Sequence, residues 1–162
     1  MTGLLLLGVV VAAVLWAIFA YNALVALKNR ADAAWNQIDV QLKRRHDVVP
    51  NLVETVRGAM EYEKATLEAV VAARTRAVEA HTPAASASAE AGLTQALSRL
   101  FAVVEQYPEL KANQNVLQLQ EELTNTENLI SFARQHYNDV VARYNTKRES
   151  FPSNLIANQF GF

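Results

Sequence analysis

The first apolar stretch of the chain, residues 4–20, reads LLLLGVVVAAVLWAIFA and has no polar face. The first charged side chain is that of Lys28. A bilayer core about 30 Å thick is spanned by roughly 20 apolar residues in a helix. A cleaved signal peptide would begin with basic residues, which are missing from residues 1–3. The pattern therefore predicts a retained transmembrane anchor over residues 1–23.

Two longer stretches repeat their apolar positions in alternating steps of three and four residues, which is typical of helices that pack along a seam. The members of the first seam are Ala31, Trp35, Ile38, Leu42, Arg45, Val49, Leu52, Val56 and Ala59. Those of the second are Val116, Leu119, Leu123, Thr126, Ile130, Ala133, Tyr137, Val140 and Tyr144. Since neither Gly nor Pro occurs between residues 21 and 49, we expect the anchor to continue as one helix into the domain. Pro50 keeps the phase of the first seam, so it is interpreted as a kink inside that helix.

The segment between the two seams decides the architecture. Residues 81–92 read HTPAASASAEAG and are predicted to form a loop, because they are rich in Ser, Pro and small residues. A helix is expected to follow from about Ala87 or Gly92 to Tyr107, with its apolar face at Leu93, Leu97, Leu100 and Val104. A turn between Pro108 and Asn113, with Asn113 as the N-cap, then leads into a last helix over residues 114–150.

Alternating β-branched runs are absent, so the chain is predicted to be all-α. If the chain reverses near residues 58–64, residues 24–152 form an antiparallel up-and-down bundle of four helices. If residues 28–80 form a single helix, the result is a three-helix variant with one very long first helix. We favour four helices, because they bury every seam. Residues 153–162 are expected to form a short apolar C-terminal segment, stopped by Gly161.

The composition of the 162 residues argues against several functional classes. There is no cysteine, which excludes disulfides, thiol catalysis and thiolate metal sites. The net charge of −1 gives no indication of nucleic-acid binding. No Glu precedes His46, His81 or His136 by three residues, so the di-metal motif of helical bundles is missing. Phosphate-loop and nucleophile-elbow motifs are missing as well. We therefore predict no catalytic residue, no metal, no cofactor and no small-molecule substrate.

The basic run Lys43, Arg44 and Arg45 supplies the first candidate interaction residues. Arg45 falls on the first apolar seam, and a buried guanidinium needs a partner, because an unpaired buried charge costs several kcal/mol. We expect that partner to be Glu121 or Glu122 on the last helix, or Asp47 nearby. The favoured interpretation is a structural ion pair, and the alternative is a contact with another subunit or an anionic lipid.

Phe151, Phe160 and Phe162 supply the second group of candidates, because they follow the last long helix. They could pack on the base of the bundle, insert into the membrane interface or dock on a neighbouring subunit, and we favour the last by a small margin. The remaining aromatic residues are mostly expected in the core by their spacing: Trp35, Tyr62, Phe101, Tyr107, Phe132, Tyr137 and Tyr144.

Several stretches of this sequence resemble the LemA family. They are AWNQIDVQLKRR at residues 34–45, DVVPNLVETV at 47–56, QLQEEL at 118–123, RQHYN at 134–138 and FPSN at 151–154. The resemblance implies a single-pass bacterial membrane protein with a helical-bundle domain. It implies no established activity.

Together these observations favour a non-enzymatic scaffold in the bacterial inner membrane, which associates with copies of itself and with membrane lipid. The alternative is an adaptor for another membrane protein, such as a protease or sensor. Lys28, Arg30 and the run at residues 43–45 follow the anchor, so the positive-inside rule places the domain in the cytoplasm. A periplasmic or extracellular domain is the alternative orientation.

Overall fold

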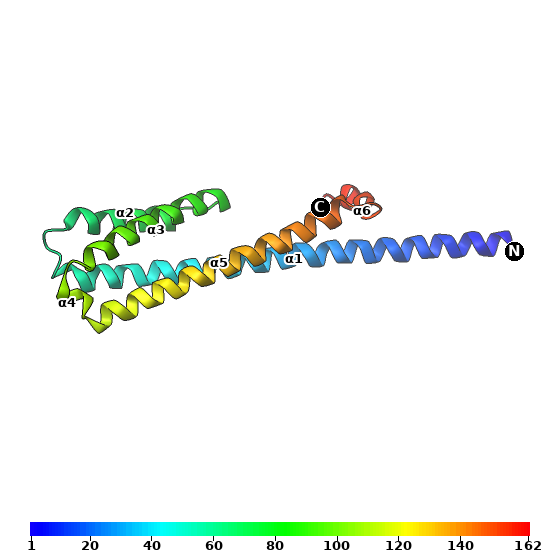
Figure 1. Ribbon diagram of the computed structural model, residues 1–162. Helices are drawn as coiled ribbons and strands as arrows, with labels where there is room; N and C mark the ends of the chain where they lie inside the picture. Colours follow the sequence, from blue (N-terminus) through cyan, green and yellow to red (C-terminus); the bar gives the residue numbers. More distant parts are fainter. The chain divides into compact units, whose positions relative to one another are not determined.

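The computed structural model describes residues 1–162 and contains helices but no strand (Figure 1). The elements are α1 (Thr2–Arg57), α2 (Lys64–Val78), α3 (Pro83–Val104), α4 (Pro108–Lys111), α5 (Gln114–Glu149) and α6 (Ser153–Phe160). The all-α prediction is confirmed. The chain reverses at residues 58–63, between α1 and α2, so the structure has four long helices rather than three.

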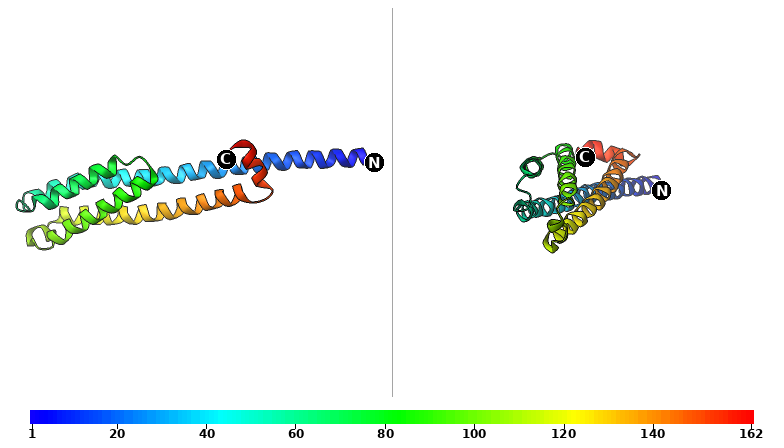
Figure 2. Two further views of the ribbon diagram at one scale, coloured as in Figure 1. Left: turned by 90° about the horizontal axis from the view of Figure 1, so that it is seen from above. Right: turned by 60° about the vertical axis from the view of Figure 1, so that its left-hand side comes forward.

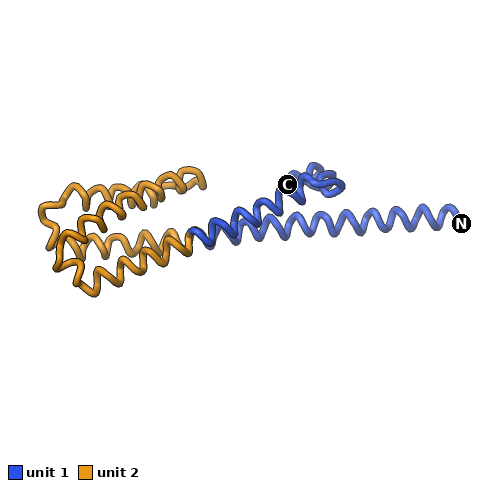
Figure 3. The backbone as a smooth tube through the Cα atoms, viewed as in Figure 1, with its two compact units in different colours: residues 1–38, 131–162 blue, residues 39–130 orange.

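The chain divides into two compact units, which Figure 3 colours separately. Unit 1 comprises residues 1–38 and 131–162, and unit 2 comprises residues 39–130. Helices α1 and α5 each contribute to both units. The division expected from the sequence, into residues 1–23, 24–152 and 153–162, stays a prediction.

Helix α1 continues without interruption through Pro50, whose side chain is exposed. The kink predicted at this residue stays a prediction. The apolar seam is confirmed over its central part, where Ile38, Leu42, Val49, Leu52 and Val56 are all buried. By contrast, the apolar residues near the start of α1 are exposed.

Unit 2 holds a continuous hydrophobic core. Helices α2 and α3 pack against each other and lie side by side in both views of Figure 2. Each fully buried Leu or Val contributes roughly 1.5–3 kcal/mol of transfer free energy. The core therefore rests mainly on these buried residues: Val49, Leu52, Val56, Met60, Val70, Leu93, Leu97, Leu100, Val104 and Val116.

The loop predicted at residues 81–92 is wrong, because α3 already begins at Pro83. Thr82 is its N-cap, and the Thr82 hydroxyl accepts a hydrogen bond from the Ala85 backbone N–H at 3.2 Å. Pro83 occupies the first turn, where its missing N–H costs no hydrogen bond and its fixed φ suits a helix. Residues that look like a loop by composition thus form a capped helix start, and the connection from α2 shrinks to residues 79–82.

The predicted boundaries of the last helix are confirmed. The Asn113 side chain accepts hydrogen bonds from the backbone N–H groups of Asn115 and Val116, at 2.9 and 3.4 Å, which caps α5. Helix α6 ends at Gly161, whose φ of +70° is the left-handed conformation that favours glycine. The Phe162 N–H donates back to the Ala157 carbonyl at 3.0 Å, so Gly161 stops the helix as expected.

Two of the expected core aromatics are exposed instead. Tyr62 lies in the turn between α1 and α2. Its burial was predicted from helical spacing, which does not apply to a residue in a turn. Phe132 follows the buried Ile130 by two residues, which turns it roughly 200° away from the seam. Trp35 and Tyr137 are half-buried, and their rings meet edge to face with centroids 5.4 Å apart.

Candidate functional site

Arg45 is buried in unit 2 although it carries a full charge, with 3% of its surface exposed. One terminal nitrogen, Nη1, lies 3.0 Å from Glu90 Oε2. The other, Nη2, lies 2.8 Å from Glu127 Oε2 and donates to the Thr94 hydroxyl at 2.8 Å. Arg45 therefore joins α1 to α3 through a charged hydrogen bond to Glu90, which is roughly twice as strong as a neutral one, and to α5 through an ion pair with Glu127.

Glu90 is the most deeply buried charged residue of this cluster, with 1% of its surface exposed. Its second oxygen, Oε1, lies 2.5 Å from His46 Nε2. The backbone carbonyl of His46 also accepts a hydrogen bond, from Arg74 Nε on α2 at 2.7 Å. The cluster thus contains side chains from all four long helices, with α2 joined through Arg74.

The two residues before Arg45 behave differently. Lys43 is exposed. Arg44 Nε and Nη2 both donate to Glu122 Oε1, at 3.1 and 2.9 Å, and both side chains remain substantially exposed. Exposed pairs of this kind contribute about 0–1 kcal/mol, because water screens the attraction. Of these two adjacent arginines, Arg44 therefore forms an exposed pair and Arg45 belongs to a buried cluster.

The predicted requirement for a partner of Arg45 is met, but the predicted partners are wrong. Glu122 pairs with Arg44, while Glu121 and Asp47 are exposed. Sequence reasoning missed Glu90 because it placed that residue in a loop. A signal was present, since Glu90 precedes Leu93 and Leu97 by three and seven residues and so continues the apolar face of α3.

This arrangement of charges is suited to positioning helices. Glu90 and Arg45 are closed off by packing, and the structure contains no group of three His, Cys, Asp or Glu that could hold a metal ion. A buried ion pair adds little net stability, but it penalises every arrangement that leaves one member unpaired. The cluster therefore specifies which faces of α1, α3 and α5 meet.

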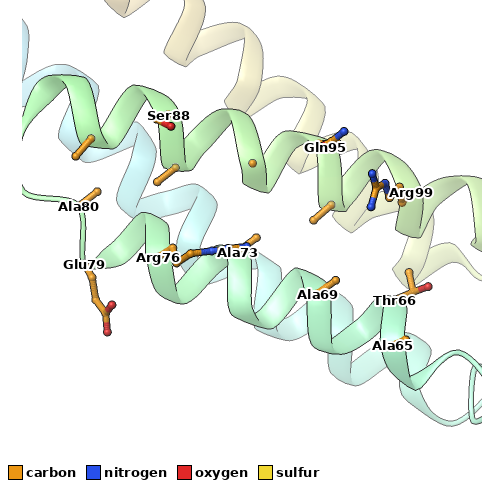
Figure 4. Close-up of a pocket in the computed structure, with 14 residues that line it drawn as sticks. Ala65, Thr66, Ala69, Ala73, Arg76, Glu79, Ala80, Ser88, Gln95 and Arg99 are labelled. Atoms are coloured by element: carbon orange, nitrogen blue, oxygen red, sulfur yellow. The ribbon is translucent and has the colours of Figure 1, made fainter.

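A groove of about 890 Å³ runs along the surface of unit 2 between α2 and α3 (Figure 4). Small side chains from both helices line it, including Ala65, Ala69, Ala89, Gly92 and Ala96. Arg76, Glu79 and Arg99 are the charged members of its lining. Small residues let the backbone of another helix approach closely.

The aromatic residues at the C-terminus lie within unit 1. The ring of Tyr21 meets Phe160 and Phe162 edge to face, with centroids 5.0 and 5.4 Å apart. Leu24 on α1 and Ala157 on α6 are fully buried. Phe160 and Phe162 thus contact α1 at Tyr21, and the three placements considered for these residues stay predictions. Phe151 takes no part in these ring contacts and is exposed.

The two units differ in charge. Unit 1 contains six Lys or Arg and three Asp or Glu, a net of +3, whereas unit 2 contains nine and thirteen, a net of −4. A cleft of about 330 Å³ in unit 1 is lined by Arg30, His136 and Arg143 together with apolar residues such as Leu27 and Val140. The unit that contains the apolar start of α1 is therefore also the unit with a net positive charge.

The N-terminal part of α1 is the only helical segment that is long and apolar enough to cross a membrane. Only 6% of its most apolar 18-residue stretch is buried. A helix that exposes almost all of its apolar side chains is not the core helix of a soluble domain, so this observation fits a membrane protein.

Comparison with known proteins gives the following matches. The family model described as "LemA family" matches residues 34–162. A magnetosome protein MamQ of Paramagnetospirillum magneticum is 27% identical, over 94% of this chain and 66% of its own length. The magnetosome protein MamQ of Magnetospirillum gryphiswaldense is 26% identical, over 88% of this chain and 62% of its own. Protein LemA of Metamycoplasma hominis is 28% identical, over 84% and 63%. The chain spans just under two thirds of the length of these relatives, and their names specify no reaction.

Proposed function

This chain belongs to the LemA family, and we propose that it is a non-enzymatic, single-pass membrane scaffold that associates with copies of itself. The observation that carries the proposal is α1. Its first turns are apolar and exposed, whereas its residues Leu42, Val49 and Leu52 are part of a buried core. One helix thus has the properties of an anchor at one end and of a packed domain at the other.

The charges that follow the apolar run favour a cytoplasmic domain. Lys28 and Arg30 are the first charged residues after the apolar run. Lys and Arg near the end of a spanning segment are retained on the cytoplasmic side. Because the chain has no native cysteine, exposed Gln118 can be replaced by a single cysteine. In intact cells, a membrane-impermeant maleimide should not label Gln118→Cys until the inner membrane is opened.

Self-association is supported by an uncovered apolar stripe on α2. Val71 and Val78 lie seven residues apart, so they share one face of the helix, and each is about half exposed. A heptad stripe on an exposed face can pair with its copy across a two-fold axis, because each side then covers the other.

The mass of particles extracted in mild detergent tests this proposal. The full chain of 17.9 kDa should appear as a multiple of that mass after correction for detergent. Val71→Lys with Val78→Lys should reduce the particle to a monomer, because charges would face each other in the interface. Leu117→Lys, at a similarly exposed position on α5, is the matched control and should leave the multiple unchanged. A monomeric wild-type particle contradicts the scaffold.

An adaptor for another membrane protein is the second candidate, and the α2–α3 groove favours it. The small residues that line the groove would admit a foreign helix at close distance. An adaptor predicts a single copy of this chain with a stoichiometric foreign protein in each particle. Gly92→Phe should project a ring into the groove, since Gly92 lines it and a Cβ there meets no atom within 4 Å. That variant should release a foreign partner and leave self-association intact.

A further inference from the structure

We propose that residues 151–162 form a second membrane contact, in which Phe151, Leu155 and Phe160 enter the lipid–water interface beside the anchor. These residues are called the C-terminal segment below. The inference rests on the proposed insertion of α1 and adds a lipid-binding surface to it.

The C-terminal segment meets α1 where the apolar run ends. Tyr21 directly follows that run, and its ring contacts Phe160 and Phe162. Tyrosine is favoured at the level of the lipid headgroups, where its ring can remain in an apolar layer while its hydroxyl reaches water. If residues 4–20 cross the bilayer core, the aromatic cluster around Tyr21 therefore lies at the membrane surface.

The C-terminal segment exposes more apolar surface than a soluble helix end requires. Phe151, Leu155 and Phe160 are 80%, 57% and 61% exposed. No residue from Ser150 to Phe162 has a charged side chain, so nothing in this segment strongly opposes entry into the interface. The exposed positions between these side chains are amides, Asn158 and Gln159, which can hydrogen-bond to headgroups and interfacial water.

The charge of unit 1 favours an anionic bilayer. Lys147 and Arg148 lie in the last turn of α5, immediately before the segment. Arg148 is partly engaged by Glu149 at 3.2 Å, but unit 1 retains its net charge of +3. Basic residues close to an anionic leaflet are attracted to it within a Debye length.

The exposed area argues for lipid rather than a second copy of the chain. A large apolar side chain has about 150–250 Å² to bury, so three that are partly exposed offer roughly 400 Å². A stable protein interface needs about 800 Å² from each partner. A bilayer already lies beside Tyr21 if α1 is inserted, and it requires no matching shape.

A single fluorescent label tests the depth of the segment. Gln159→Cys in the full chain, labelled with nitrobenzoxadiazole, is reconstituted in vesicles of 70% phosphatidylcholine and 30% phosphatidylglycerol. Quenching by lipids with a nitroxide on the headgroup or the upper acyl chain should be at least about threefold stronger than for labelled Gln118→Cys on α5. Equal quenching at the two positions overturns the inference.

Two further measurements separate this inference from the proposed anchor. Phe151→Ser with Leu155→Ser leaves the contacts of Tyr21 intact and should lower the quenching at residue 159 at least twofold. Unchanged quenching contradicts the role of these side chains.

Resistance of the wild-type chain to alkaline carbonate extraction tests the insertion of α1 itself. A resistant chain with an unquenched label refutes only the C-terminal contact, whereas a released chain refutes the anchor. Disulfide-linked dimers of the unlabelled Gln159→Cys variant, together with an unquenched label in the labelled preparation, would identify a second copy as the occupant.

Discussion

The two units of this protein treat apolar and charged side chains in opposite ways. Unit 2 packs most of its large apolar residues into one core and also buries Arg45 and Glu90. Unit 1 leaves most of its apolar start exposed and has a net positive charge. Unit 2 thus packs most of its apolar side chains inside the protein, whereas the apolar start of α1 in unit 1 leaves its side chains exposed. Experiments that apply one chemical change to both regions can test this distinction.

The largest effect is expected in the buried cluster of unit 2. Glu90→Leu removes the carboxylate that binds Arg45 and His46, and leaves the guanidinium buried with Glu127 as its remaining acidic partner. Breaking a buried pair in this way typically costs about 3–5 kcal/mol. Thermal melting of the detergent-solubilised chain, followed by circular dichroism, should show a large loss of stability.

Glu122→Leu is the matched control for that experiment, because it removes the exposed partner of Arg44. Its cost should not exceed about 1 kcal/mol. Equal destabilisation by the two variants would show that burial of the Arg45 cluster does not matter for stability.

The next effect concerns the anchor. Val11→Lys places a charge near the middle of the apolar run, which costs about 2.5–3.5 kcal/mol of insertion free energy. The fraction of chain that resists carbonate extraction should fall clearly. Val40→Lys makes the same change at an exposed valine of unit 2 and should leave extraction unaltered. If both variants behave alike, residues 4–20 do not insert as a spanning helix.

A glycine-to-alanine change should have opposite signs in the two units. In unit 2, a Cβ at Gly92 meets no atom within 4 Å, so Gly92→Ala should stabilise α3 by about 0.5–1 kcal/mol. In unit 1, Gly161 has a φ of +70°, so Gly161→Ala should destabilise the end of α6 by about 1–2 kcal/mol. Melting temperatures report the first change, and hydrogen exchange at the Phe162 amide reports the second.

The smallest effect is expected at Lys111. A hydrogen bond and the attraction of the Glu105 carboxylate raise the pKa of Lys111 above its ordinary 10.5. The raised pKa means that this pair stabilises the fold fully below pH 10.5 and ceases to do so as the pH rises through the folded-state value. Because Lys111 is exposed, Lys111→Ala should not measurably shift the melting temperature at pH 7. A shift of several degrees would show that water screens this pair less than its exposure indicates.

The fold was largely predictable because heptad spacing reports directly on burial. Arg45 is the clearest instance, since its position among Leu42 and Val49 predicted a buried charge, and the charge is buried. The failure at residues 81–92 came from composition. Thr82 and Pro83 form a start signal that outweighs the Ser content that follows, because a satisfied N-cap and a fixed φ act locally.

The candidate site was less predictable, because pairing depends on helix rotation across the bundle. Glu121, Glu122 and Glu127 all lie on α5, and only the rotation of α5 decides which of them reaches Arg45. The same limit applies to Phe132, which lies two residues after the buried Ile130 on the same helix but is exposed. Spacing identifies the buried face of a helix, but it does not identify the residue opposite.

The pairing of Arg45 with Glu90 also has a consequence for the order of events during biosynthesis. The two residues are 45 positions apart, so at about 5–20 residues per second the arginine leaves the ribosome roughly 2–9 seconds before its counter-ion. Until then the nascent α1 has no α3 carboxylate to neutralise its guanidinium. The buried pair of Arg45 and Glu90 can therefore form only after α3 has been translated.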